Sequence, residues 1–154
     1  MPTRPEIPRS LRAARRFIDG FAALELVEDL RWFEAAARWG FCVAVANPSP
    51  PSGAIPSITH WWILLDSIYP WGQIDIYPAA RGGITATFHH QNYNGPPKKG
   101  CPLWRTGDIC VRSPGFVFQR AAFDEEPIGR SGRLRWLLVR LIQWVTRAST
   151  GKLV

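Results

Sequence analysis

The sequence predicts an α+β domain in which helices cover an antiparallel meander of strands. Apolar residues recur at spacings of three and four near both ends of the chain, whereas the middle alternates apolar and polar residues as strands do. Thirteen glycines and fourteen prolines predict many turns between these elements. With 154 residues the chain has the length of one domain, so we expect residues 1–154 to form a single unit.

A basic amphipathic helix is predicted to begin at Ser10, a residue type that caps helix N-termini. Its apolar face repeats at helical spacing through Leu11, Ala14, Ile18 and Phe21. Other faces of the same helix carry the basic side chains of Arg12, Arg15 and Arg16. The next stretch, 24–39, stays open, because its start alternates like a strand while the alanines at 35–37 suit a helix.

Four strands are predicted in the middle of the chain, at 41–45, 59–65, 73–77 and 84–88. The residues 79–83 between the last two resemble a hairpin turn. Cys42 is expected to be a core residue of the first of these strands. Residues 91–108 and 112–132 read as long irregular segments, because they are rich in turn-forming residues.

The clearest element is a helix from about Arg133, with Gly151 where a helix would end. Its apolar residues keep helical spacing from Leu134 to Ala148. Trp136, Arg140 and Trp144 form an adjoining stripe at four-residue steps. This stripe can be part of the core, or a partner surface in which Arg140 stacks on the indoles.

The composition narrows the function classes. Nineteen Lys and Arg against twelve Asp and Glu give a net charge of +7, which favours an acidic partner such as nucleic acid, an anionic membrane or an acidic protein. The three cysteines are an odd number and widely spaced, which argues against a secreted protein held together by disulfides. They favour a protein of the reducing cytoplasm. The N-terminal residues lack the apolar stretch of a signal peptide, and no apolar run is long enough to span a membrane.

Two short segments contain a candidate nucleophile and its supporting groups: His90-Gln91-Asn92 and Gly107–Val111, which includes Cys110. A cysteine near an amide and an imidazole can form a thioester, and the amide N–H can stabilise the oxyanion. Cys110 can equally be a small core residue, because free cysteines are often buried. A zinc site of Cys101, Cys110, His89 and His90 is disfavoured, since neighbouring histidines on a strand point to opposite faces.

The order of these motifs resembles that of the ubiquitin-conjugating enzyme family. Ile68-Tyr69-Pro70 matches the family's Tyr-Pro step, His90-Gln91-Asn92 its His-Pro-Asn signature, and Gly107-Asp108-Ile109-Cys110-Val111 its Gly-x-Ile-Cys-Leu motif. Gln91 replaces the signature proline, and Asn92 lies eighteen positions before Cys110, much further than in the family, so Asn94 is an alternative to Asn92. With one helix after the cysteine, the chain looks like the shortened ubiquitin-conjugating-like proteins of bacterial antiphage operons, which are often fused to a ubiquitin-activating-like domain.

This resemblance implies a ubiquitin-conjugating-like fold whose Cys110 receives a ubiquitin-like protein as a thioester from an adenylating, activating enzyme, in trans or fused C-terminally, and passes it to an amine of a target protein. Asn92 would support the oxyanion, His90 would be structural, and Asp108 would orient the amine. Arg12, Arg15 and Arg16 would dock the activating enzyme. The resemblance implies no cofactor, metal or membrane. The alternatives are a basic, aromatic-rich nucleic-acid-binding domain and a non-catalytic scaffold.

Overall fold

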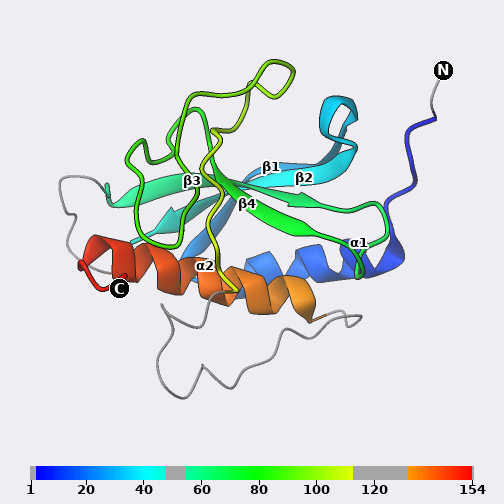
Figure 1. Cartoon of the computed structure of the whole chain (residues 1–154). Coiled ribbons are helices and arrows are strands. Elements are labelled where there is room, and N and C mark those ends of the chain that lie inside the picture. The colour runs from blue at the N-terminus through cyan, green and yellow to red at the C-terminus, as the bar shows by residue number, and fades with distance from the viewer. Residues whose placement is uncertain (1–2, 48–54, 113–131, 154) are drawn as a thin grey trace.

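The fold is α+β, as predicted, and Figure 1 shows both helices on one face of a twisted sheet. The computed structural model describes residues 3–47, 55–112 and 132–153. The helical elements are α1 (Arg9–Arg15), the 3-10 turns η1 (Arg16–Gly20) and η2 (Glu34–Ala36), and α2 (Arg133–Ser149). The strands β1 (Leu24–Phe33), β2 (Arg38–Ala46), β3 (Ile58–Leu65) and β4 (Ile74–Pro78) pair antiparallel in the order β1-β2-β3-β4. In the described part of the chain, no helix is long and apolar enough to cross a membrane.

The alternation of side chains across the sheet creates two apolar layers. On the helix side, β2 and β3 contribute a series of fully buried residues that pack against α1 and α2, including Phe41, Val43, Trp61 and Ile63. On the opposite face a smaller cluster forms around Cys42, Trp62, Leu64 and Trp104. Part of the long segment after β4 lies over this second face (Figure 1), where Cys101, Leu103 and Trp104 pack against the cluster. The functional segments described below lie instead beside β4, because Ile109 bonds to the backbone of Ile76 and is buried in the helix-side core.

The first helix confirms the predicted apolar face, since Leu11, Ala14 and Ile18 are buried. The predicted cap at Ser10 is wrong: Pro8 is the N-cap residue and makes no side-chain capping bond. The Ser10 hydroxyl instead donates to the carbonyl oxygen of Tyr69 at 2.8 Å. Ser10 therefore fastens α1 to the loop between β3 and β4.

The C-terminal helix begins at Arg133, as expected, and the same Tyr-Pro loop holds its first turn. The hydroxyl of Tyr69 accepts a hydrogen bond from the backbone N–H of Leu134 at 3.1 Å. The Arg133 guanidinium donates to the carbonyl oxygen of Pro70 at 3.0 Å. At the other end Gly151 has φ +71°, a left-handed conformation that suits glycine after a helix. The two sequence signals at the helix ends are thus confirmed.

The undecided stretch 24–39 consists of β1, the turn η2 and the start of β2. The predicted strand at 84–88 and its hairpin are wrong, because no strand forms there. The side chain of Asn94 donates to the carbonyl oxygens of Ile84 (2.7 Å) and Ala86 (3.1 Å), and the N–H of Phe88 is bound by Gln91. Side chains thereby occupy the backbone groups that a hairpin partner would need. The predicted irregular segment 112–132 lies largely outside the described residues.

Candidate functional site

The two segments identified in the sequence lie side by side. Residues 90–92 pair antiparallel with residues 108–110 through an isolated bridge between Gln91 and Ile109. The N–H of Cys110 donates to the carbonyl oxygen of His90 at 2.7 Å, and the N–H of Asn92 donates to that of Asp108 at 3.0 Å. The N–H of Ile109 bonds to the carbonyl oxygen of Ile76, which ties this pair to β4. The histidine–asparagine and cysteine segments therefore form one unit on the sheet.

Gln91, which stands in place of the signature proline, bridges this unit. Its side-chain oxygen accepts from the N–H of Phe88 at 2.9 Å, and its side-chain nitrogen donates to the carbonyl oxygen of Gly107 at 2.9 Å. A Cβ at Gly107 would lie 2.6 Å from the Cβ and 2.7 Å from the Cα of Asn94, closer than real side chains allow. Glycine is required here because two backbone segments touch. The sequence marked both residues as motif positions without indicating these contacts.

The three cysteines occupy different environments, and only the Cys110 side chain is exposed. Its neighbours Ile109 and Val111 are buried in the core under the sheet, so Cys110 points outward. Cys42 is buried, as expected of a strand core residue, and burial raises the pKa of its thiol to about 12. Cys101 is half-buried beside the outer cluster. An exposed thiol can reach a bulky acyl donor, which a buried thiol cannot.

The candidate asparagines also differ. Asn92 is exposed, and its side-chain amide donates to a carboxylate oxygen of Asp108 at 2.8 Å. Asn94 is 3% exposed, and its amide group is bonded to Ile84, Ala86 and Arg105. A side chain held in this way serves the fold of its own loop. The structure thus places Asn92, and not Asn94, on the outward face together with Asp108.

His90 has φ +58°, so the chain turns sharply at this residue. Its carbonyl oxygen, as described above, receives the N–H of Cys110. The backbone of His90 therefore helps to set the position of the cysteine. His89, the other histidine of the disfavoured zinc set, is exposed. Within the described residues no three His, Cys, Asp or Glu side chains gather as metal ligands would.

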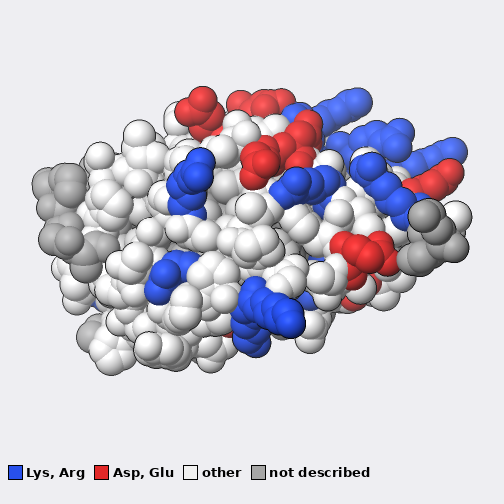
Figure 2. Space-filling model, turned by 90° about the horizontal axis from the view of Figure 1, so that it is seen from above, with Lys and Arg blue, Asp and Glu red and all other residues white. Residues whose placement is uncertain are grey.

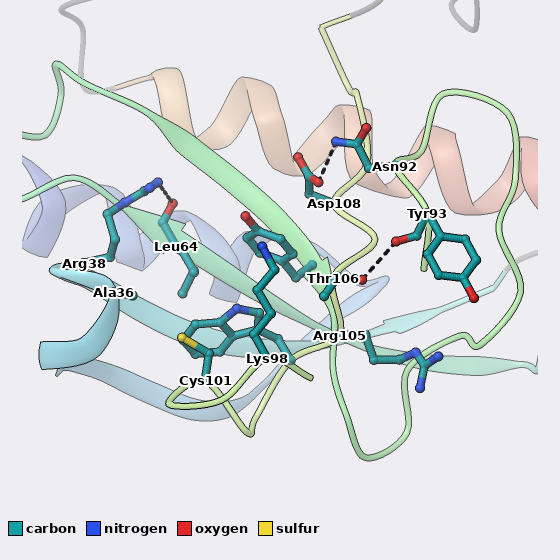
Figure 3. A pocket seen from close by; sticks show the side chains of 12 residues that line it. Ala36, Arg38, Leu64, Asn92, Tyr93, Lys98, Cys101, Arg105, Thr106 and Asp108 are labelled. Atoms are coloured by element: carbon teal, nitrogen blue, oxygen red, sulfur yellow. Dashed lines mark hydrogen bonds between the residues drawn. The ribbon is translucent and has the colours of Figure 1, made fainter. Parts of the chain in front are cut away.

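A cavity of about 540 Å³ adjoins Asn92 and Asp108. Figure 3 shows it between the loop 92–106, the strand β4 and the start of β2. Tyr77 and Trp104, whose ring centroids lie 6.3 Å apart, also line it, and burial raises the pKa of the Tyr77 hydroxyl to about 12. Three basic residues also line it: Arg38, which is paired with Asp75 at 3.1 Å, Lys98 and Arg105. Sequence reasoning did not identify this cavity, because its walls come from distant parts of the chain.

The three basic residues predicted as a docking surface lie together. Arg12, Arg15 and Arg16 line one shallow cavity of about 360 Å³ beside Asp29. The Arg15 guanidinium donates to both carboxylate oxygens of Asp29, at 3.0 and 2.8 Å, and this pairing holds the pKa of Asp29 below its usual value. Arg12 and Arg16 are exposed and have no ion partner within the described residues. Two of the three guanidinium groups thus remain accessible to an acidic partner.

The predicted stripe on α2 does not form a surface. Trp144 is fully buried and packs edge-on against Trp61, with ring centroids 5.6 Å apart. Arg140 is 4% exposed, and its Nε donates to the carbonyl oxygen of Val111 while its guanidinium lies 4.4 Å from the centre of the Trp136 ring. Trp136 is half-buried. The stacking of Arg140 is confirmed for Trp136, one of the two predicted indoles, whereas Trp144 packs against Trp61. Trp144 and Arg140 belong to the interior, because this helix packs on the sheet with more than one face.

On the face seen in Figure 2, the basic residues that the structure describes do not form a single groove. Figure 2 shows Lys and Arg side chains scattered over the face seen from above, with the densest group at one end interspersed with acidic side chains. Proteins that bind nucleic acid through the backbone concentrate positive charge along one path. The face in Figure 2 therefore gives the nucleic-acid alternative no specific support.

Comparison with known proteins gives a further indication. No family model matches the chain. The chain is 30% identical over 149 residues to the ATP-dependent ubiquitin transferase-like protein Cap2 of Enterobacter hormaechei subsp. hoffmannii (strain UCI 50). The match covers 96% of this chain and 24% of Cap2, so the chain spans about a quarter of the length of that relative. The similarity confirms the expected resemblance to bacterial ubiquitin-conjugating-like proteins.

Proposed function

Because the chain is related to a bacterial ubiquitin transferase-like protein, we propose that it is a ubiquitin-conjugating-like acyltransferase and that Cys110 carries the acyl group. Residues 1–154 would act as one module with a ubiquitin-conjugating-like fold, to which the four-stranded sheet and its two helices are suited. The observation that supports this most is the position of Cys110. It is the exposed cysteine of the chain, and it is paired with the segment that carries His90 and Asn92.

The reaction would proceed in two acyl transfers. The Cys110 thiolate attacks the thioester on an activating enzyme, so that a new carbon–sulfur bond forms and the enzyme's thiolate leaves. An amine of the target protein then attacks the Cys110 thioester, giving an amide and the free thiol. Thiolates are good nucleophiles and good leaving groups, so both steps need little acid–base assistance near the cysteine.

The neighbouring side chains have distinct proposed roles. Asn92 would donate its amide N–H to the oxyanion that forms during each transfer. In the resting state this N–H is held by Asp108, so the donor is already oriented on the outward face. Asp108 would in turn receive a hydrogen bond from the incoming amine. His90 would keep a structural role through its backbone carbonyl.

Partner recognition would involve the basic cavity on α1. Arg12 and Arg16 are exposed there, and Arg15 is fixed by Asp29. We assign this surface to the activating enzyme, whether that enzyme is separate or part of the same polypeptide. The cargo would be a ubiquitin-like protein, the biological setting antiphage defence in the cytoplasm, and no metal or organic cofactor would be required.

The proposal is tested by reconstitution with ATP, an activating enzyme and a ubiquitin-like protein. Wild-type protein should form an adduct that reductant removes, Cys110→Ala should form none, and Cys110→Ser should form an oxyester that resists reductant. Asn92→Ala should slow discharge to an amine more than it slows loading. Equal adduct in Cys110→Ala would refute the assignment of the site, and steeply salt-dependent binding of single-stranded nucleic acid by a protein that never loads would favour the alternative class.

A further inference from the structure

The basic residues of the chain are unevenly divided between the two residue types. Sixteen are arginine and three are lysine, namely Lys98, Lys99 and Lys152. Lysine is ordinarily among the commonest residues of globular proteins. Arginine keeps the positive charge but cannot be deprotonated, so it offers no nucleophilic amine. A protein that carries a reactive thioester can be acylated at its own accessible lysines. Because most basic residues of this chain are arginines, few such lysines are present.

Two of the three remaining lysines lie on the loop that starts and ends at the proposed site. The backbone of this loop turns between Lys98 and Cys101, where the N–H of Cys101 donates to the carbonyl oxygen of Lys98 at 3.0 Å. Gly100, with φ +86°, takes the position in the turn that requires a left-handed residue. Lys99 is consequently at the exposed tip of the turn, whereas Lys98 is at its base.

The side chain of Lys98 lines the cavity next to Asn92 and Asp108, and Lys99 does not. Figure 3 shows Lys98 extending from the loop toward the side of the cavity where Asp108 and Asn92 lie. Lys98 has no ion partner within the described residues, and Asp108 is the one acid among the residues that line this cavity. The amine of Lys98, one of three lysines in the chain, thus points toward Asp108 and Asn92.

Cys110 lies on the same outward side as Asp108. The two are separated by one residue on an extended segment, about 7 Å along the chain at the usual strand rise. The intervening Ile109 points into the core. Cys110 is not itself among the residues that line the cavity, but an acyl group on its sulfur would start beside the side of the cavity that Asp108 forms.

We propose that Lys98 is an internal acceptor, and that the chain modifies itself by transferring the acyl group from Cys110 to the Nζ atom of Lys98. This rests on the proposed function of Cys110. In the transfer the neutral amine attacks the thioester carbonyl, the carbon–nitrogen bond forms as the carbon–sulfur bond breaks, and a proton passes from nitrogen to the departing thiolate. The products are an isopeptide bond at Lys98 and the free thiol of Cys110.

The test uses a fluorescent peptide ending in glycine, supplied as its 2-mercaptoethanesulfonate thioester, which loads accessible thiols by exchange. After excess reagent is removed, the full-length protein is incubated at mildly alkaline pH and divided between gels with and without reductant. Tandem mass spectrometry then locates the reductant-resistant peptide. Lys98→Arg is compared with Lys99→Arg, which keeps the same charge one residue away, and thermal melting confirms that both variants fold.

We expect the wild-type protein and Lys99→Arg to accumulate resistant adduct on Lys98. In Lys98→Arg this adduct should fall roughly tenfold or more, while loading of Cys110 is unchanged, because an amine held in place has a high effective concentration. Resistant adduct spread equally over the three lysines, or formed equally in Cys110→Ala, would overturn the inference. A Cys110 thioester that stays reducible would overturn the inference alone, whereas absence of any Cys110 adduct would overturn the proposed function as well.

Discussion

Gln91 gives the most specific prediction about how the site is assembled. Its two side-chain hydrogen bonds, each 2.9 Å long, connect the end of the irregular segment 84–88 to Gly107, three residues before Cys110. Gln91→Met keeps the length of the side chain but removes both bonds. Each is expected to contribute about 1 kcal/mol, because both are partly buried and join a side chain to the backbone. The variant should therefore lose about 2 kcal/mol of unfolding free energy.

For a chain of this length, that loss corresponds to a melting temperature lower by about 4 to 8 °C. Circular dichroism during heating and urea titration measure the two quantities independently. Gln73→Met serves as the matched control, since the Gln73 side chain is exposed and makes no hydrogen bond in the described structure. If Gln91→Met melts at the same temperature as the wild-type protein and Gln73→Met, Gln91 does not hold the two segments together.

Two further predictions concern the packing around the site and the pH dependence of stability. Gly107→Ala should lower the free energy of unfolding, measured in urea, by about 3 kcal/mol, because the added methyl group would meet the backbone of Asn94. Gly20→Ala is the control and should have little effect, since no atom lies within 4 Å of the added Cβ. Equal losses in the two variants would refute the close contact at Gly107. Stability should fall from about pH 9 to about pH 12, because the Cys42 thiol ionises in the unfolded chain before it can ionise in the folded one. Cys42→Ala should flatten this decline without abolishing it, since the raised pKa of Tyr77 acts in the same direction, and an unchanged slope would contradict the raised thiol pKa.

The strand β2 could be predicted because Phe41, Val43 and Val45 recur at the two-residue period of a strand. The strand β3 could be predicted because a strand buried on both faces requires a nearly uninterrupted apolar run. The strand β1 could not, because shifts in its register at Glu28 disturb the alternation of its side chains. The segment 84–88 shows the opposite error, because it was predicted to be a strand and is irregular. Its alternation is regular, but Asn94 and Gln91 bind its backbone from further along the chain, and no local pattern reveals that.

The site was predictable from the order of its motifs more than from their spacing. Asn92 precedes Cys110 by eighteen positions, a spacing that by itself does not indicate that the two segments are neighbours in space. The intervening loop folds over the outer face of the sheet and returns, so that residues 90–92 pair with 108–110. The role of Trp144 could not be read from its spacing. Helical periodicity shows which residues share a face, but not whether a second face is also covered.

The most direct test of the central claim is to determine which sulfur carries the acyl group. After reconstituted loading and alkylation of the remaining thiols, peptide mass spectrometry distinguishes Cys110 from Cys42 and Cys101. We predict that the ubiquitin-like protein is found on Cys110 and that Cys101→Ala loads as the wild-type protein does. A thioester found equally on Cys101, or loading that survives in Cys110→Ala, would contradict the claim that Cys110 is the acyl carrier.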